Sequence, residues 1–353
     1  MLLPEKVVQM ERDVPETKQW LDTYRMNQKA TVSTYANNLC SVFEAAGIKT
    51  FDQVKDFCAS DLQKIYDIAE KDGWSKTTLN DRIANLKRFL SWCSAEGLCE
   101  VNALNRVKRF KCEKEPTYVF TVEDQEKIMN TVTSKRLRCI LGIYLETGYR
   151  KMSVINLRLS DFEGSKITVT DKGDKTTTCS LSDELAGMIN DYIKTDRAEA
   201  MKRYVGAGGT DAGWLFVSCF QGGRKNTDWE NGLKLHANTL NDQIKNVARK
   251  AGVKNWDKIT PHSFRKRFGI TEYYSNGMDI IATQRKMHHS NVSQTAYYVG
   301  KYDITEEEKE ILTKRNQKES LAIDTLKEQI EMLAKTIEQQ QKIIGALLEK
   351  EVK

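Results

Sequence analysis

The chain has 353 residues, of which 40% are hydrophobic and 29% are charged, so it is long enough to form two domains with separate hydrophobic cores. No apolar run approaches the length that crosses a bilayer, since the best candidate, Cys139 to Leu145, is far too short. Charge begins at Glu5 and no apolar core region precedes it, unlike a secretory signal, so we expect a cytoplasmic protein with no membrane partner.

The net charge of +6 is unevenly distributed. Between Asn241 and Lys286, ten lysine and arginine residues stand against four acidic residues, whereas residues 304–353 are slightly acidic. Localised positive charge favours a polyanionic partner. None of the eight cysteines belongs to a C-x-x-C pair, so we expect small buried hydrophobic residues or free thiols rather than a zinc site.

Residues 14–107 show the apolar spacing of α-helices. One predicted helix, "TVSTYANNLCSVFEAAG", ends at Gly47, and another runs from the N-cap Ser75 to Gly97. The pattern predicts an all-α domain of about four helices over residues 1–107. Basic residues remain for its outer face, and we predict that they contact DNA: Lys76, Arg82, Lys87 and Arg88.

The stretch 105–117, "NRVKRFKCEKEPT", is charged and has few apolar residues, so we place an interdomain linker at 108–117. Four of its cations could lie along a phosphate backbone, namely Arg106, Lys108, Arg109 and Lys111, and we predict the first three as DNA contacts.

A second domain is expected at 118–305, beginning with Thr121 as a helix N-cap. The single apolar stripe of "SKRLRCILGIYLETG" predicts a helix. "KITVTDKGDKTTTCSL" alternates in polarity and contains a D-K-G-D turn, which predicts a β-hairpin with Lys172 at its tip and Lys175 just beyond. "GWLFVSCF" is predicted to form a third strand.

The segment 306–353 shows a heptad pattern. Isoleucine and leucine alternate at three- and four-residue steps, interrupted by one glutamine: Ile323, Leu326, Ile330, Leu333, Ile337, Gln340, Ile344 and Leu347. This narrow seam favours a parallel two-stranded coiled coil over a helix that folds back onto its own domain.

Three short stretches carry candidate chemistry. In "TGYR", Arg150 follows a Thr-Gly sequence that is expected to end a helix. At such a position its planar guanidinium could donate hydrogen bonds to two oxygens of one phosphate. In "TPHSFRKRF", Thr260 is a candidate N-cap, and His262 and Arg265 share one face of the following helix. "MHHSNVSQTAYYV" places two histidines shortly before two tyrosines. Taken singly, each stretch also has an ordinary structural explanation.

Together these motifs resemble the tyrosine recombinase (phage integrase) family over residues from about 14 to 305. The family pattern T-G-x-R is matched at Arg150, and H-x-x-R is matched at His262 and Arg265. The family's L-G-H, followed nine residues later by the nucleophile, is matched by His289 and Tyr298. The "DKGDK" hairpin resembles the family's G-K-G-x-K turn, which indicates Lys172 first and Lys175 second.

The chain departs from the family pattern at supporting positions. The Leu and Gly of L-G-H are replaced by Met287 and His288, and the acidic residue three after the first arginine is Ser153. The His that often follows H-x-x-R is Lys266. Adjacent residues of a helix diverge by about 100°, so Tyr297 and Tyr298 cannot both face one phosphate. We therefore expect His288 and Tyr297 to be supporting residues.

The resemblance implies a mechanism. The two arginines would neutralise the phosphate, His262 would assist removal of the proton from Tyr298, and His289 would donate a hydrogen bond to a non-bridging oxygen. Tyr298 would form a 3′-phosphotyrosyl bond, and Lys172 would protonate the leaving 5′-hydroxyl. The bond energy is kept in the intermediate, so no metal, ATP or other cofactor is expected.

The resemblance also implies the architecture and the partners. The fold would be mainly α with a small β-sheet: an N-terminal helical, SAM-like core-binding domain, an α+β catalytic domain and a C-terminal helix. The expected partner is double-stranded DNA carrying a specific recombination site, bound by a tetramer, and a dimer could form through the tail. Three cations of the second domain complete the predicted DNA-contact set: Lys175, Lys266 and Arg267.

The expected activity is site-specific DNA recombination, as in integration and excision, and the motifs are shared by integrases, Xer-like resolvases and transposases. The alternatives are strand relaxation by a type IB topoisomerase-like enzyme and a DNA-binding protein that has kept the fold without catalysis. A purely structural coiled-coil protein is disfavoured by the two globular domains. A separate N-terminal domain and an oligomerising tail argue against the topoisomerase, and the full residue set argues against a non-catalytic protein.

Overall fold

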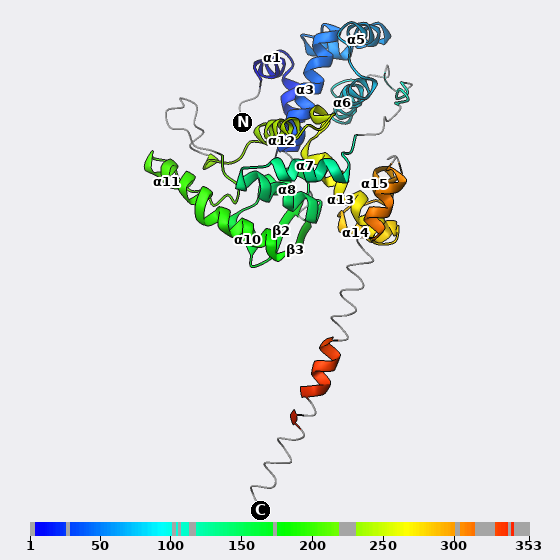
Figure 1. The fold of residues 1–353 in the computed structure, drawn as a ribbon. Helices are drawn as coiled ribbons and strands as arrows, with labels where there is room; N and C mark the ends of the chain where they lie inside the picture. The colour runs from blue at the N-terminus through cyan, green and yellow to red at the C-terminus, as the bar shows by residue number, and fades with distance from the viewer. Residues whose placement is uncertain are drawn as a thin grey trace, which may run out of the picture. The chain divides into compact units, whose positions relative to one another are not determined.

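The computed structural model describes residues 4–25, 29–100, 104, 107–112, 118–171, 175–218, 231–300, 304–314, 329–337 and 340–341 (Figure 1). The chain divides into two compact units, Met1–Glu115 and Pro116–Lys353. The boundary lies within the residues 108–117 that the sequence predicts as a linker. Each unit is mainly helical, and the three-stranded sheet belongs to the second, which agrees with the predicted mainly α fold with a small β-sheet.

Helices form the described part of the N-terminal unit. Their bounds are α1 Glu5–Asp13, α2 Pro15–Arg25, α3 Lys29–Ala46, α4 Phe51–Lys55, α5 Ala59–Lys71 and α6 Lys76–Ala95. The sequence predicted about four helices beginning near residue 14, so α1 and the short α4 were missed. Pro15 is the first residue of α2, a position where the missing N–H costs nothing, so it separates two helices.

The core of this unit lies between α3 and α6. Ser75 caps α6 as predicted, because its hydroxyl accepts a hydrogen bond from the backbone N–H of Thr78 at 3.1 Å. Trp20 of α2 is fully buried, stacks on Tyr35 and contacts Phe89. Most of the apolar positions at helical spacing in α3 and α6 are buried: Leu39, Val42, Phe43, Ala46, Leu79, Ile83, Leu86 and Leu90. Tyr35 and Trp92, at the same spacing, are only partly buried against this core.

The C-terminal unit consists of helices and one small sheet, and the strands of that sheet follow one another in the sequence. Its elements are α7 Val122–Thr131, α8 Lys135–Thr147, α9 Lys151–Ile155, η1 Leu159–Asp161, β1 Phe162–Glu163, β2 Lys166–Asp171, β3 Lys175–Ser180, α10 Asp183–Tyr192, η2 Ile193–Arg197, α11 Ala198–Gly206, α12 Ala237–Lys250, η4 Trp256–Lys258, α13 Pro261–Ser275, α14 Ile280–Lys286 and α15 Val292–Val299. α13 packs against α8, and α13, α14 and α15 contact one another (Figure 1).

The sheet is antiparallel in the order β1-β2-β3, and β2 and β3 form the predicted hairpin. The prediction of a third strand at "GWLFVSCF" was wrong. The described part of that segment forms only two isolated bridges, between Arg158 and Trp214 and between Val217 and Lys234. Its apolar character reflects burial in the core rather than strand pairing. The third strand is instead the short β1.

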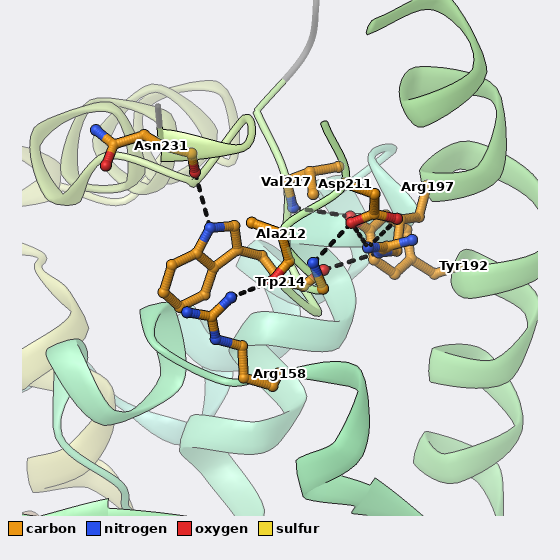
Figure 2. A network of polar contacts seen from close by, with 9 residues as sticks. Arg158, Tyr192, Arg197, Asp211, Ala212, Trp214, Val217 and Asn231 are labelled. Atoms are coloured by element: carbon orange, nitrogen blue, oxygen red, sulfur yellow. Dashed lines mark hydrogen bonds and ion pairs between the residues drawn. The ribbon is translucent and has the colours of Figure 1, made fainter. Parts of the chain in front are cut away.

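Polar contacts fix the segment around Trp214, as Figure 2 shows. Arg197, which is buried at the end of η2, donates to the Trp214 carbonyl at 2.8 Å and pairs with the Asp211 carboxylate. The guanidinium carbon of Arg158 lies 3.2 Å from the centroid of the indole ring. The indole N–H donates to the carbonyl of Asn231 at 2.8 Å. Backbone hydrogen bonds to Leu157 and Leu159 hold the same segment against the start of η1.

The described residues after α15, 304–314, pack against α13. Residues 306–314 are helical, and Leu312 is buried. Glu308 accepts hydrogen bonds from Arg267 of α13 at 2.5 Å and from the backbone N–H of Val122 at 2.9 Å. These contacts dock the segment onto α13 and the start of α7.

Part of the predicted coiled-coil segment is described. Residues 329–337 are helical, and Ile330, Leu333 and Ile337 of the seam are more than half exposed. Most of the other seam positions lie outside the described residues. None of the described helices has the length and apolar character required to cross a membrane.

Candidate active site

The first turn of α13 presents two of the predicted site residues. Thr260 caps the helix in a capping box with Ser263, and Pro261 is the first helical residue, as the sequence predicts. His262 and Arg265 follow on one face. Phe264 is fully buried and packs on Phe120 at a ring-centroid distance of 4.7 Å. This aromatic anchor fixes the orientation of the helix.

Arg265 joins two loops. It is only 2% exposed, its Nη1 donates to the carbonyl of Gly148, and its Nη2 donates to the carbonyl of Met287 at 2.6 Å. Gly148 ends α8 in the left-handed conformation at φ 61°, and a Cβ there would meet the ring of Phe268 at 2.2 Å. The Thr-Gly stop is thus required for the loop that Arg265 holds.

Arg150 lies just beyond this stop and is the N-terminal flanking residue of α9. It is exposed, whereas its neighbour Tyr149 is only 1% exposed. The Tyr149 hydroxyl lies 3.2 Å from the carbonyl oxygen of Ile167 on β2 and 3.1 Å from that of Thr177 on β3. The Arg150 loop is therefore anchored to both strands of the hairpin.

Tyr298 of α15 meets the α13 face. Its hydroxyl oxygen lies 2.8 Å from Nε2 of His262, within hydrogen-bond distance. The Arg265 side chain also hydrogen-bonds Tyr298. The ammonium of Lys266 lies 5.9 Å from the centroid of the phenol ring. The half-buried phenol is thus surrounded by one imidazole and by cations.

His289 follows the end of α14. It is 8% exposed, and its Nδ1 lies 2.9 Å from the Thr295 hydroxyl. Its backbone N–H donates to the carbonyl of Gln284 at 3.1 Å, and the amide of Gln284 donates back to the His289 carbonyl at 2.9 Å. The ring centroids of His289 and Tyr298 are 5.1 Å apart.

The local environment keeps both histidines neutral. Desolvation lowers the pKa of His262 from 6.5 to about 4, and the charges of Lys266 and Arg265 act in the same direction. The His262 residue is nevertheless exposed overall, so the site can be reached from solvent. Desolvation, followed by the charges of Arg265 and Arg150, lowers the pKa of His289 to about 4. At neutral pH a neutral imidazole faces the phenol.

Two further groups are shifted. Desolvation raises the pKa of Tyr298, and this rise is opposed by the charge and hydrogen bond of Arg265 and by the charge of Arg150. Desolvation also lowers the pKa of Lys266 to about 8. The arrangement can bind an anion between the arginines and can transfer the phenolic proton to an adjacent base.

The other histidine and the other tyrosine of the two adjacent pairs, His288 and Tyr297, lie beside the site. His288 contacts Cys179 and Tyr149, as described below, and the Tyr297 ring centroid lies 6.4 Å from that of Tyr298. The structure thus brings together Arg150, His262, Arg265, His289 and Tyr298. Their catalytic roles remain predictions.

Two predicted positions on the hairpin are not described in full. Lys172 lies outside the described residues, and only the backbone of Lys175 is described, paired with Asp171 at the start of β3. Their roles also remain predictions.

Most of the described cations predicted to contact DNA from the N-terminal unit lie at its surface. Lys76, Arg88, Lys108 and Arg109 are exposed, and the ammonium of the half-buried Lys87 donates to the carbonyl of Val107 at 2.9 Å. Arg106 lies outside the described residues.

Arg82 and Arg267 occupy different environments. The guanidinium of Arg82 lies over the Trp74 ring at 3.6 Å, and its Nε and Nη1 are buried, so it does not simply extend from an outer face. Arg267 is only 1% exposed and pairs with Glu308. Its prediction as a DNA contact was wrong, because this guanidinium packs inside the protein. Lys266, only 2% exposed, lies at the candidate active site.

Sequence reasoning missed Thr295 and Tyr149, which position His289 and the Arg150 loop. Neither residue carries a local signal, because their contacts form only when α14, α15 and the hairpin come together. Among the described residues, no group of three or more His, Cys, Asp or Glu side chains is arranged to hold a metal ion.

Comparisons with known proteins agree with the motif order. The model of the phage integrase family matches residues 119–304. The chain is 25% identical over 224 residues to the tyrosine recombinase XerC of Caldanaerobacter subterraneus subsp. tengcongensis, covering 62% of this chain and only 57% of that protein. It is 29% identical over 233 residues to the tyrosine recombinase XerA of Pyrococcus furiosus, covering 64% of this chain and 70% of that protein.

Solved structures share the fold. A XerH site-specific recombinase bound to a palindromic difH substrate is 20% identical, with a TM-score of 0.58 over 80% of this chain and 79% of that one. A lambda integrase dimer bound to a COC′ core site is 13% identical, with a TM-score of 0.59 over 83% of this chain and 98% of that one. At these identities the likeness establishes the architecture alone.

Proposed function

The chain belongs to the phage integrase family, which is the family of the tyrosine recombinases. We propose that it carries out site-specific DNA recombination, as in integration and excision. In this proposal the protein cleaves and rejoins DNA strands through a covalent 3′-phosphotyrosyl intermediate. The observation that carries this proposal is the distance of 2.8 Å between the Tyr298 hydroxyl and Nε2 of His262. A phenol beside a neutral base and two arginines is suited to attack a phosphodiester.

His262 acts as the base in the first step. With a pKa of about 4 it is uncharged at neutral pH, so Nε2 can accept the phenolic proton as Tyr298 attacks. The bond from the Tyr298 oxygen to phosphorus forms while the bond from phosphorus to the 5′-oxygen breaks. Lys172 is the proposed acid that supplies the proton to that leaving oxygen.

The two arginines stabilise the charge that develops on the phosphate. Two N–H groups of Arg265 are used on the carbonyls of Gly148 and Met287, and its guanidinium also meets Tyr298. These contacts support the proposal that Arg265 binds the phosphate that Tyr298 attacks. Arg150 is exposed, and its positive charge also acts on Tyr298, so it supplies a second positive charge to the site. Such preorganised charges contribute most where water is excluded.

His289 donates a hydrogen bond to a non-bridging oxygen. When the Thr295 hydroxyl donates to Nδ1 of His289, the proton of the neutral ring resides on Nε2, which is then a donor. The lowered pKa of His289 favours this uncharged form. In this arrangement the Thr295 hydroxyl selects the tautomer of His289.

The partner is double-stranded DNA with a specific site, bound by an assembly that we propose to be a tetramer. Solved structures with this fold hold DNA, namely the difH complex of XerH and the core-site complex of lambda integrase. The phosphotyrosyl bond conserves the energy of the phosphodiester, so attack by the 5′-hydroxyl of a partner strand reverses the first step without an external energy source.

Strand exchange tests the proposal. Duplexes cut from the DNA that flanks the gene are incubated in pairs of different length, and recombinant duplexes are resolved on a gel. The proposal predicts recombinants of intermediate length with wild type and none with Tyr298→Phe. Relaxation of a supercoiled plasmid without exchange would favour a topoisomerase, and binding without cleavage would favour a non-catalytic protein.

A further inference from the structure

His288 adopts a backbone conformation that side chains disfavour. Its φ is +53°, in the left-handed region. Its N–H donates to the carbonyl of Arg285 at 3.0 Å, and the next N–H, of His289, donates to Gln284 at 3.1 Å, which together form a Schellman motif at the end of α14. Glycine is the usual residue at such a position. A histidine at this position therefore carries a conformational cost.

The His288 side chain contacts two other elements. Its Nε2 lies 3.8 Å from Sγ of Cys179 on β3, within hydrogen-bond reach for sulfur. Its ring lies against Tyr149, with centroids 5.9 Å apart and planes tilted by 37°. A glycine would satisfy the turn but would make neither contact.

These contacts converge on the parts that carry the candidate catalytic groups. His288 precedes His289, and Tyr149 precedes Arg150. Cys179 pairs in register with Ile167, whose carbonyl also accepts from the Tyr149 hydroxyl. The His288 side chain therefore contacts the hairpin and the Arg150 loop. Its backbone conformation determines the direction in which the chain continues to His289.

Arg265 already links the same two loops, through the carbonyls of Gly148 and Met287. Each of these carbonyls belongs to the residue immediately before Tyr149 or His288. The contact between the Tyr149 and His288 rings is thus a second, parallel link that does not use the arginine.

We propose that His288 is a positioning residue that braces the His289 loop against the Arg150 loop and strand β3, so that both reach the same phosphate. This inference rests on the proposed function for the reaction that it serves. It assigns the strained histidine a role in geometry, not in proton transfer.

The test compares two glycine variants. His288→Gly removes the brace and relieves the left-handed strain. Met278→Gly is the matched control, because Met278 also has a left-handed φ, of 67°, just beyond a helix, but its side chain is 60% exposed. Cleavage of a nicked suicide duplex is measured in single turnover, together with DNA affinity and thermal unfolding.

We expect His288→Gly to slow cleavage by roughly ten- to hundredfold, since misplacing a catalytic group by about 1 Å can cost ~100-fold. DNA affinity should stay within about twofold, and Tm should stay within a few degrees because relief of strain offsets lost contacts. Met278→Gly should cleave at the wild-type rate. Cys179→Ala, which leaves the backbone unchanged, should give a smaller loss. A His288→Gly variant as fast as wild type overturns the proposal.

Hydrogen exchange makes the result independent of cleavage. Amides at 149–151 and 176–180 should exchange faster in His288→Gly than in wild type and be unchanged in Met278→Gly. If wild type forms no adduct, the proposed function fails while this comparison still decides the brace. Unchanged exchange in both variants would overturn the brace even if wild type cleaves.

Discussion

The ion pair between Arg267 and Glu308 offers the sharpest prediction for stability. The pair is buried, with side-chain exposures of 1% and 11%, and Glu308 also accepts from the Val122 N–H. Removing one partner of a buried pair costs about 3–5 kcal/mol because the other charge stays buried. Two nitrogens of Arg267, Nε and Nη2, already lack a hydrogen-bond partner among the described residues, so this guanidinium has little other support.

We expect Glu308→Ala to lower the free energy of unfolding of the C-terminal unit by about 4 kcal/mol. Glu308→Gln keeps an acceptor and should cost about 1–2 kcal/mol. The control is Glu310→Ala, which breaks an exposed pair with Lys314 and should cost less than about 0.5 kcal/mol. Urea denaturation measures all three. Equal midpoints for Glu308→Ala and Glu310→Ala would refute the argument from burial.

Three other predictions concern the site and the tail. An NMR titration of His262 in the free protein should give a midpoint near pH 4. Because this pKa lies below the unfolded value, the stability that His262 contributes is complete above about pH 6.5 and is lost as the pH falls toward 4. A midpoint near pH 6.5 would contradict the desolvation of this ring. Arg265→Lys cannot bridge the carbonyls of Gly148 and Met287, so single-turnover cleavage should fall by at least ~100-fold, and a loss below about threefold would oppose its role. If the tails of two chains pair as a coiled coil, the full chain should sediment as a dimer without DNA, and a chain ending at residue 314 should sediment as a monomer. Identical sedimentation of the two chains would favour a tail that does not self-associate.

Local signals located most elements around the site. Thr260 and Pro261 predicted the start of α13, and the Thr-Gly stop predicted the end of α8, because capping depends on nearby residues alone. Helix α1 was not predicted from these local signals. It ends just before α2, whose first residue, Pro15, separates the two helices. The motif spacings identified the residues that the structure brings together.

Long-range packing could not be predicted from the sequence. Arg267 looked like one more cation in a basic stretch, and only the return of the chain after α15 places Glu308 beside it. The pairing of His289 with Thr295 likewise depends on the angle between α14 and α15. The segment around Trp214 has strand-like composition, but burial against the core accounts for it.

The central claim is that Tyr298 forms the bond to DNA. A covalent complex trapped on a nicked duplex can be digested with nuclease and protease, and the peptide that carries both tyrosines can be sequenced by mass spectrometry. The geometry predicts a nucleotide on Tyr298, whose hydroxyl faces His262, with Tyr297 unmodified. A nucleotide on Tyr297, or an adduct that persists in Tyr298→Phe, would contradict the account.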